Sequence, residues 1–282
     1  MNVSASVSAS APASAVFGTK WLSLREPYDG AARSGAVLAA VGRAFAGHGR
    51  AAVTDLACGT GATLRALAPH LPARQNWRLI DRDRALLEEA LARGAAAVPA
   101  GSSVTAVNCD LDGDFESALG DCDLVTASAL LDLVSQAWFD RLLGMLARRS
   151  RPFYAALSWD GGVVLSPECR WDAEVIAAVD RHQRTDKGLG PALGPDAARV
   201  APARLREAGF TVLEGRSDWC FAPRDGAIQA EMLAGWAGAA RAMSGGDPGW
   251  VGEWLAEREA HVAAGRSHMR VGHLDFLATP AA

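Results

Sequence analysis

The sequence has little positive charge and almost no lysine, since only Lys20 and Lys187 are lysines among its 28 basic residues. Its 32 acidic residues give a formal net charge of −4 at pH 7. A chain of this charge has no general attraction for the phosphate backbone of nucleic acid. We therefore expect no nucleic-acid partner.

Cysteine is also scarce, and the five that occur form no Cys-x-x-Cys pair: Cys58, Cys109, Cys122, Cys169 and Cys220. None of the six histidines forms a His-x-x-x-His pair or lies beside a cysteine at ligand spacing. This usage is typical of a cytoplasmic protein with reduced thiols. It predicts no bound metal.

Long apolar runs are absent, because no stretch of about eighteen apolar residues occurs, and no membrane span is expected. Residues 1–14 lack the positive and continuous apolar regions of a signal peptide, and their composition predicts a disordered tail. The length of 282 residues and the hydrophobic content of 50% suit one sizeable α/β domain with an appendage.

The most informative stretch runs from residue 51 to 64, where an apolar segment meets a glycine pair and then a helical pattern. This order predicts a buried strand, a tight turn and a helix, with Gly59 and Gly61 letting the backbone approach a ligand. A dinucleotide fingerprint would need a third glycine where Leu64 stands. Asp55 would repel a diphosphate, but it suits a ligand with an ammonium and a sulfonium.

Val53–Gly61 resembles motif I of the class I S-adenosyl-L-methionine-dependent methyltransferases, with Asp55, Gly59, Gly61 and Ala57, where glycine is commoner. The resemblance implies S-adenosyl-L-methionine as cofactor. It also implies a doubly wound, mostly parallel α/β sheet of seven strands with helices on both faces. Motifs support it over about residues 51–160, and the rest of the chain matches only in the order of its elements.

The later predicted strands also end in or beside acidic residues. Asp81 follows Gly61 by 20 residues, which returns the second strand beside the first with its acid at the same edge. The resemblance implies that Asp81 binds the ribose hydroxyls, that Asp110 takes the adenine amine and that the Leu111 amide faces a ring nitrogen. Arg82 and Ser128 are further expected cofactor contacts. Asp83 is interpreted as a plain helix N-cap.

Residues 15–50 are expected to form a helical cap, broken at Pro27 because proline cannot donate into a helix interior. In the resembled family such a helix commonly folds over the cofactor. Arg33 is the candidate to pair with the cofactor's carboxylate. A solvated helix face is the alternative for this polar segment.

Residues 51–282 would then form the cofactor-binding methyltransferase domain, with an insertion at about 163–202. This insertion combines a helix with a polar, glycine- and proline-rich loop that carries His182 and Arg184. We expect it to act as a substrate lid, although a solvated linker is the alternative. The fifth strand is expected to end at Trp159 and Asp160, at the same sheet edge as the other acids.

The motifs of exocyclic-amine nucleic-acid methylation and of cytosine C5 methylation are absent, so a small-molecule acceptor is favoured, through oxygen or nitrogen rather than carbon. His182 is the leading base, followed by Asp132 and Asp160. Trp159, Arg184 and Trp138 are expected substrate contacts.

Two alternatives remain open: a non-catalytic interaction protein of methyltransferase fold and, less favoured, an NAD-dependent dehydrogenase. We expect a monomer or homodimer with no membrane partner.

Overall fold

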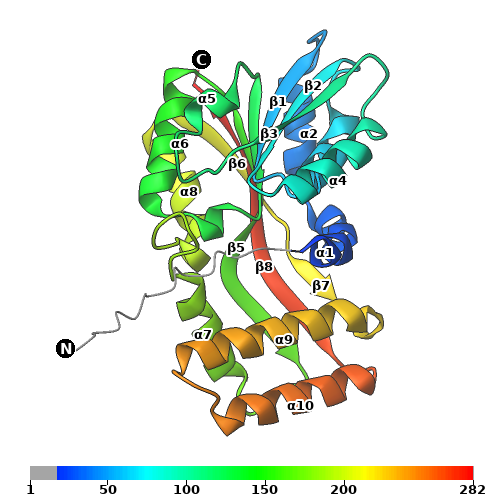
Figure 1. Cartoon of the computed structure of the whole chain (residues 1–282), viewed down its shortest axis with the longest axis vertical. Helices are drawn as coiled ribbons and strands as arrows, with labels where there is room; N and C mark the ends of the chain where they lie inside the picture. Colours follow the sequence, from blue (N-terminus) through cyan, green and yellow to red (C-terminus); the bar gives the residue numbers. More distant parts are fainter. Residues whose placement is uncertain (1–17, 282) are drawn as a thin grey trace, which may run out of the picture.

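The computed structural model describes residues 18–281, and the expected tail at 1–14 and residues 15–17 of the expected cap lie outside the described residues. Within this range one sheet runs through the molecule (Figure 1). Its strands are β1 (Ala51–Leu56), β2 (Gln75–Asp81), β3 (Ser103–Asn108), β4 (Leu124–Ser128), β5 (Phe153–Ser166), β6 (Phe210–Arg216), β7 (Trp219–Phe221) and β8 (His268–Pro280).

The strand order is β3-β2-β1-β4-β5-β8-β6, and β7 also pairs with β8. The first five strands of this order are parallel, whereas β8 runs antiparallel to β5, β6 and β7. The predicted doubly wound, mostly parallel sheet is confirmed. Because β6 and β7 share β8 as partner, together they take the place of the expected sixth strand.

The break between β6 and β7 lies at Ser217 and Asp218. Gly215 stays inside β6, paired with Asp275 of β8. A Cβ at Gly215 would lie 2.1 Å from the Oγ of Ser34. This glycine therefore allows the close approach of Ser34 and does not interrupt the strand.

Helices cover both faces of the parallel strands (Figure 1). On one face lie α2 (Gly35–Ala44), α3 (Ala62–Leu67) with the 3-10 helix η1 (Ala68–His70), and α4 (Arg84–Ala95). On the other face lie α5 (Glu116–Leu119), α6 (Gln136–Arg148) and α8 (Ala197–Glu207). Each face buries its own apolar cluster, as expected for a sheet wound in both directions.

Side-chain caps fix the start of two of these helices. The carboxylate of Asp83 accepts hydrogen bonds from the backbone N–H groups of Ala85 and Leu86, which confirms its interpretation as an N-cap. The hydroxyl of Ser135 accepts from the N–H of Trp138 at 3.2 Å and begins α6 in the same way. These caps hold both helices in register on the sheet.

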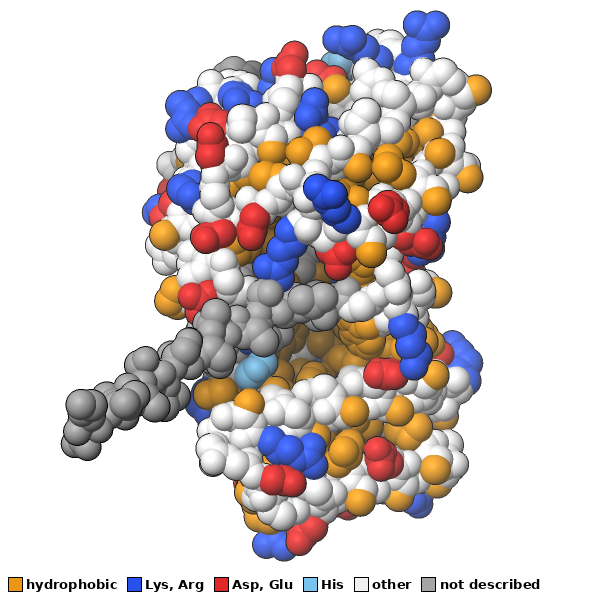
Figure 2. Space-filling model, in the orientation of Figure 1, with side chains coloured by type: hydrophobic (Ala, Val, Ile, Leu, Met, Phe, Trp, Pro, Cys, Tyr) orange, Lys and Arg blue, Asp and Glu red, His pale blue; other side chains and the backbone are white. Residues whose placement is uncertain are grey.

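A lower part of the molecule extends beyond the parallel strands (Figure 1). It contains α7 (Asp172–Gln183), α9 (Gly226–Met243) and α10 (Gly249–Ala263), packed around the ends of β5, β7 and β8. The 3-10 helices η2 (Leu131–Leu133), η3 (Gly194–Asp196) and η4 (Pro223–Asp225) complete the elements. On the face shown in Figure 2 the surface is hollowed between the two parts, and hydrophobic side chains gather there.

The prediction that the fifth strand ends at Asp160 is wrong, because β5 continues to Ser166. Its continuation pairs with β8, with Val163 opposite Val271. The register shifts between Trp159 and Val163, where Gly161 has a φ of 82°. A long antiparallel partner thus carries the strand through Gly161 and past Asp160.

Helix α1 (Thr19–Ala32) contains Pro27 in its interior, so the predicted break at this proline is wrong. The helix is held directly after the proline by tertiary contacts. Tyr28 donates to Asp225 at 3.1 Å, and Asp29 accepts from the indole Nε1 of Trp219 at 3.0 Å. Packing therefore offsets the hydrogen bond that the proline cannot donate.

No helix within residues 18–281 is both long and apolar enough to cross a membrane.

Candidate functional site

A pocket lies at the carboxyl ends of the parallel strands, between the turn after β1 and the segments after β2, β3 and β4. Its volume is about 190 Å³. It spans the point where the strand order reverses, between β1 and β4, which is where open α/β sheets bind their ligands. Helix α1 closes one side through Leu22, Arg25 and Asp29.

The turn after β1 is built from left-handed residues. Ala57, Gly59 and Gly61 have φ values of 48°, 54° and 81°. The conformation costs a non-glycine residue about 1 kcal/mol or more, so Ala57 holds a strained position on the pocket wall. Gly59 also lines the pocket. Gly61 does not, and a Cβ there would lie 3.4 Å from Ala90 of α4, so this glycine serves the turn and helix packing.

Asp81 ends β2 and is held toward the pocket by two backbone donors. Its Oδ2 accepts from the N–H of Gly59 at 2.9 Å, and its Oδ1 accepts from the N–H of Asp83 at 3.0 Å. The residue is 9% exposed and lines the pocket together with Arg82. The carboxylate is therefore fixed in place and keeps a lone pair on each oxygen for a ligand hydroxyl.

The end of β3 contributes Asp110 and Leu111 to the same wall. Asp110 is exposed and accepts from the N–H of Asp112 at 3.1 Å. The carbonyl of Leu111 accepts from the indole Nε1 of Trp138 at 2.7 Å. Trp138 itself is buried, stacks on Phe115 and does not line the pocket, so it supports the wall from behind.

Asp55 lies beneath the turn and does not line the pocket. It belongs to β1, which continues to Leu56, and its Oδ1 accepts from the hydroxyl of Thr126 at 2.7 Å. Its Oδ2 is buried without a hydrogen-bond partner within residues 18–281. Burial raises the pKa of Asp55 to about 7, although Thr126 and the charge of Arg33 act against this rise.

Arg33 reaches the pocket only indirectly. Its guanidinium is buried and donates to the hydroxyl of Tyr154 at 3.0 Å and to the Oγ of Ser128 at 3.1 Å. Burial alone would lower the pKa of Arg33, but Tyr154 and Asp275 raise it above the usual value. Ser128 lines the pocket, whereas Arg33 lies behind it.

Arg25 also lines the pocket, although it was not predicted from the sequence. Its Nε donates to Asp29 at 2.9 Å, and its guanidinium lies 5.2 Å from the centre of the Trp219 ring. Leu22, Arg25 and Asp29 are spaced by three and four residues, so they share one helix face. That spacing is the signal that could have identified them.

A buried acid lies in η2, next to the pocket, although it does not itself line the wall. Asp132 is 8% exposed, and its Oδ1 has no hydrogen-bond partner in the part of the chain that the structure describes. Burial raises the pKa of Asp132 to about 6, while the charges of Arg25 and Lys187 act in the opposite direction. The neighbouring residues Leu130 and Leu133 line the pocket.

The loop after α7 reaches the pocket through Lys187 and Leu189, neither of which the sequence analysis selected. The Nζ of Lys187 lies 3.2 Å from the Nδ1 of His182 and donates to the carbonyl of the same histidine at 2.8 Å. Burial and the charge of Lys187 lower the pKa of His182. His182 therefore contacts Lys187 of the pocket wall but does not line the pocket itself.

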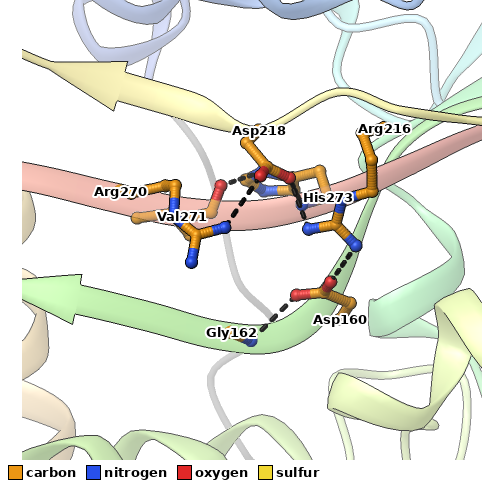
Figure 3. Close-up of polar contacts among 7 residues, drawn as sticks. All are labelled: Asp160, Gly162, Arg216, Asp218, Arg270, Val271 and His273. Carbon is orange, nitrogen blue, oxygen red and sulfur yellow. Dashed lines mark hydrogen bonds and ion pairs between the residues drawn. The ribbon is translucent and has the colours of Figure 1, made fainter.

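Three further candidates lie away from the pocket. Trp159 and Asp160 are in the continued part of β5, and Arg184 is exposed and paired with Asp180 and Asp196. Figure 3 shows Asp160 in a separate polar cluster, where it accepts from Arg216 and from the N–H of Gly162. The extension of β5 is what separates Trp159 and Asp160 from the other acids.

A doubly wound sheet with this strand order, a glycine turn after β1 and acids after β2 and β3 defines the class I methyltransferase fold. Residues 53–152 match the family model described as a methyltransferase domain. No protein among the curated sequences matches the chain.

Several solved structures resemble it. They include a cyclopropane-fatty-acyl-phospholipid synthase-like protein from Lactobacillus casei, at 13% identity over 90% of this chain and 98% of that chain, with a TM-score of 0.50. An S-adenosylmethionine-dependent methyltransferase from Thiobacillus denitrificans, in complex with S-adenosyl-L-homocysteine, is 17% identical over 93% of this chain and 99% of that chain, with a TM-score of 0.45. An S-adenosylmethionine-dependent methyltransferase from Geobacter sulfurreducens, also in complex with S-adenosyl-L-homocysteine, is 14% identical over 89% of this chain and 92% of that chain, with a TM-score of 0.43.

Residues 53–152 thus match a methyltransferase domain, and the predicted resemblance is confirmed. S-Adenosyl-L-methionine is the cofactor of this class of enzyme.

Proposed function

We propose that this chain transfers a methyl group from S-adenosyl-L-methionine to a small-molecule acceptor, through an oxygen or a nitrogen atom. The observation that carries the proposal is that Gly59, Asp81 and Asp110, from three different strand ends, line one pocket. S-Adenosyl-L-methionine supplies a methyl group that its positively charged sulfur has already activated.

The residues of the pocket suit the parts of this cofactor. Asp81 would accept from the ribose hydroxyls, because each of its oxygens keeps a free lone pair beside one backbone donor. Asp110 would accept from the adenine amine, and the N–H of Leu111 would face a ring nitrogen. At Ala57 and Gly59 the pocket wall consists mainly of backbone, because neither residue has a large side chain.

Arg25 is the residue we assign to the cofactor's carboxylate. It lines the pocket, and its only side-chain hydrogen bond within residues 18–281 uses Nε, toward Asp29. A planar guanidinium offers two further nitrogens in the geometry that a carboxylate prefers. Arg33 would act on the wall through Ser128, and Asp55 would support the turn from below.

The acceptor side of the pocket offers two groups that can take a proton. Asp132 has a carboxyl pKa of about 6, and the pKa of His182 is lowered, so both are unprotonated near neutral pH. Either could take the proton of a hydroxyl or ammonium acceptor. Asp132 lies between two residues of the wall, whereas Lys187 stands between His182 and the pocket, so Asp132 is the better placed base.

We further propose that the segment 163–202 covers the acceptor and excludes water, with Lys187 and Leu189 as its contacts with the pocket. The hollow between the two parts of the molecule is rich in hydrophobic side chains (Figure 2), which supports an apolar acceptor. Asp160 is excluded as the base in this scheme because it is paired with Arg216.

The cofactor part of the proposal is tested by calorimetric titration with S-adenosyl-L-homocysteine and, separately, with NADH. We expect binding of the first ligand only, and a loss of affinity of at least about tenfold in Asp81→Ala, because charged hydrogen bonds contribute about 1.5–3 kcal/mol. Asp121→Ala is the control, since Asp121 is exposed and does not line the pocket. Binding of NADH alone would favour the dehydrogenase.

The reaction is tested by incubating the protein with S-adenosyl-L-methionine and a panel of small phenols, carboxylic acids and amines, followed by mass spectrometry. We expect S-adenosyl-L-homocysteine and a product heavier by one methylene unit. Cofactor binding without turnover of any acceptor would favour the non-catalytic alternative. A product methylated at carbon would refute the choice of oxygen or nitrogen.

A further inference from the structure

Three side chains of metal-binding type meet in the lower part of the molecule. Cys169, Glu257 and His261 each offer one ligand atom, and these atoms all lie within 4.8 Å of one another. Cys169 lies in the turn between β5 and α7, while the other two lie on α10. The site joins segments about 90 residues apart, so no local spacing in the sequence revealed it.

The backbone holds these ligands in a common direction. Glu257 and His261 are four residues apart on α10, which places them on one face of the helix. The N–H of Cys169 donates to the Oδ2 of Asp172 at 2.8 Å, which fixes the turn that carries the thiol.

A buried ion pair clamps α10 to that same turn. Arg258 has no exposed side-chain surface, and its Nε donates to the Oδ1 of Asp172 at 2.9 Å. Its Nη1 donates to the carbonyl of Pro167 at 2.7 Å, and the indole of Trp254 donates to Asp172 at 2.8 Å. The two backbone segments that carry the three ligands are therefore held together by a rigid frame.

One atom of the cluster is left unsatisfied by the protein. The Nδ1 of His261 is buried and has no hydrogen-bond partner within residues 18–281. An unpaired buried polar atom is unfavourable, so such atoms call for a ligand or a functional reason. The thiol of Cys169 is also buried, whereas Glu257 is exposed, which leaves the cluster open to solvent on one side.

We propose that Cys169, Glu257 and His261 bind a divalent transition-metal ion of the zinc type. Thiolate, imidazole and carboxylate are the ligands that zinc takes in proteins, with a fourth position open to water. Tetrahedral bonds of about 2.0–2.3 Å place ligand atoms about 3.3–3.8 Å apart, so small side-chain rotations close the site. The thiol releases its proton to solvent when it binds the ion.

None of the three ligands lines the cofactor pocket. The ion would instead tie the turn before α7 to α10, two elements of the lower part. Binding of an ion to the folded chain raises its stability by mass action. We therefore expect zinc to raise the melting temperature and to leave the affinity for S-adenosyl-L-homocysteine unchanged.

The test uses the full chain, freed of metal by a chelator and then titrated with zinc in competition with a chromophoric chelator. We expect one ion per chain with a dissociation constant of about micromolar or tighter. Titration with Co²⁺ should give a thiolate-to-metal charge-transfer band, which Cys169→Ser abolishes. His261→Ala should weaken zinc binding by at least about tenfold.

Cys220→Ser and His268→Ala are the matched controls, because both residues are exposed and neither belongs to the cluster. Both should keep the ion, and Cys220→Ser should keep the charge-transfer band. Glu257→Gln, at an exposed position, provides a variant that folds even if Cys169→Ser does not, and it should weaken zinc binding. Absence of stoichiometric zinc in the wild type, or zinc affinity unchanged in Cys169→Ser, His261→Ala and Glu257→Gln, would overturn the proposal.

Discussion

The backbone N–H of Gly59 donates to the Oδ2 of Asp81 at 2.9 Å, so the turn after β1 is tied to the acid that ends β2. The carboxylate thus holds the turn and at the same time faces the pocket. A substitution at either residue is expected to shift the position of the other, because their hydrogen bond joins two walls of the proposed cofactor site.

The two glycines of the turn should respond differently to alanine. Both have positive φ, so Gly59→Ala and Gly61→Ala should each lower the free energy of unfolding by about 1–2 kcal/mol. Only Gly59 lines the pocket, so only Gly59→Ala should also weaken binding of S-adenosyl-L-homocysteine. Denaturant unfolding and calorimetry measure the two effects, and equal losses of affinity in both variants would contradict this distinction.

Arg25 should distinguish ligands with and without a carboxylate. We expect Arg25→Gln to weaken S-adenosyl-L-homocysteine by at least about tenfold, since a charged hydrogen bond contributes about 1.5–3 kcal/mol. The affinity for 5′-methylthioadenosine, which lacks the amino-acid part, should change little. Calorimetric titration of both ligands measures the ratio of their dissociation constants.

Arg33→Gln is the control for this assignment. It removes the donors to Tyr154 and Ser128, so we expect lower stability with an unchanged ratio between the two ligands. If Arg33→Gln reduces the difference between the affinities for the two ligands and Arg25→Gln does not, Arg33 is the partner of the cofactor's carboxylate, as predicted from the sequence.

Asp132 should make stability depend on pH. Its pKa is about 6 in the folded protein against an ordinary value of 3.8, so the folded state binds the proton more tightly than the unfolded state. Stability is therefore lost as pH rises from about 4 through about 6. Asp132→Asn removes this loss, and its advantage over the wild type should grow by about 1 kcal/mol between pH 5 and pH 8. Urea unfolding at both pH values measures it, and an advantage that is the same at both would refute the role of Asp132.

Arg258 should be critical for the lower part of the molecule. Its side chain has no exposed surface and pairs with Asp172, which is 16% exposed. Arg258→Met leaves that carboxylate without its charged partner, so the free energy of unfolding should fall by about 3–5 kcal/mol. Lys20→Met breaks the exposed pair with Glu231 and should cost less than about 1 kcal/mol. Chemical denaturation compares them, and similar losses would show that burial does not decide the effect.

The sequence by itself determined the parallel half of the sheet and its strand ends. The glycine turn after residue 56, the acid at Asp81 and the cap at Asp83 are local patterns, in which each residue's conformation follows from its near neighbours. The fold class could be predicted for the same reason, because alternating strands and helices allow few topologies. The expected break at Pro27 failed, because contacts with Asp225 and Trp219 outweigh the local preference.

Only the tertiary structure decided which side chains share a site. The pairing of β5 with β8 carried Asp160 away from the pocket, and the path of α1 brought Arg25 to it instead of Arg33. The cluster of Cys169, Glu257 and His261 likewise depends on α10 docking against a turn about 90 residues earlier. These side chains come together through the packing of whole helices and strands, which no single stretch of sequence encodes.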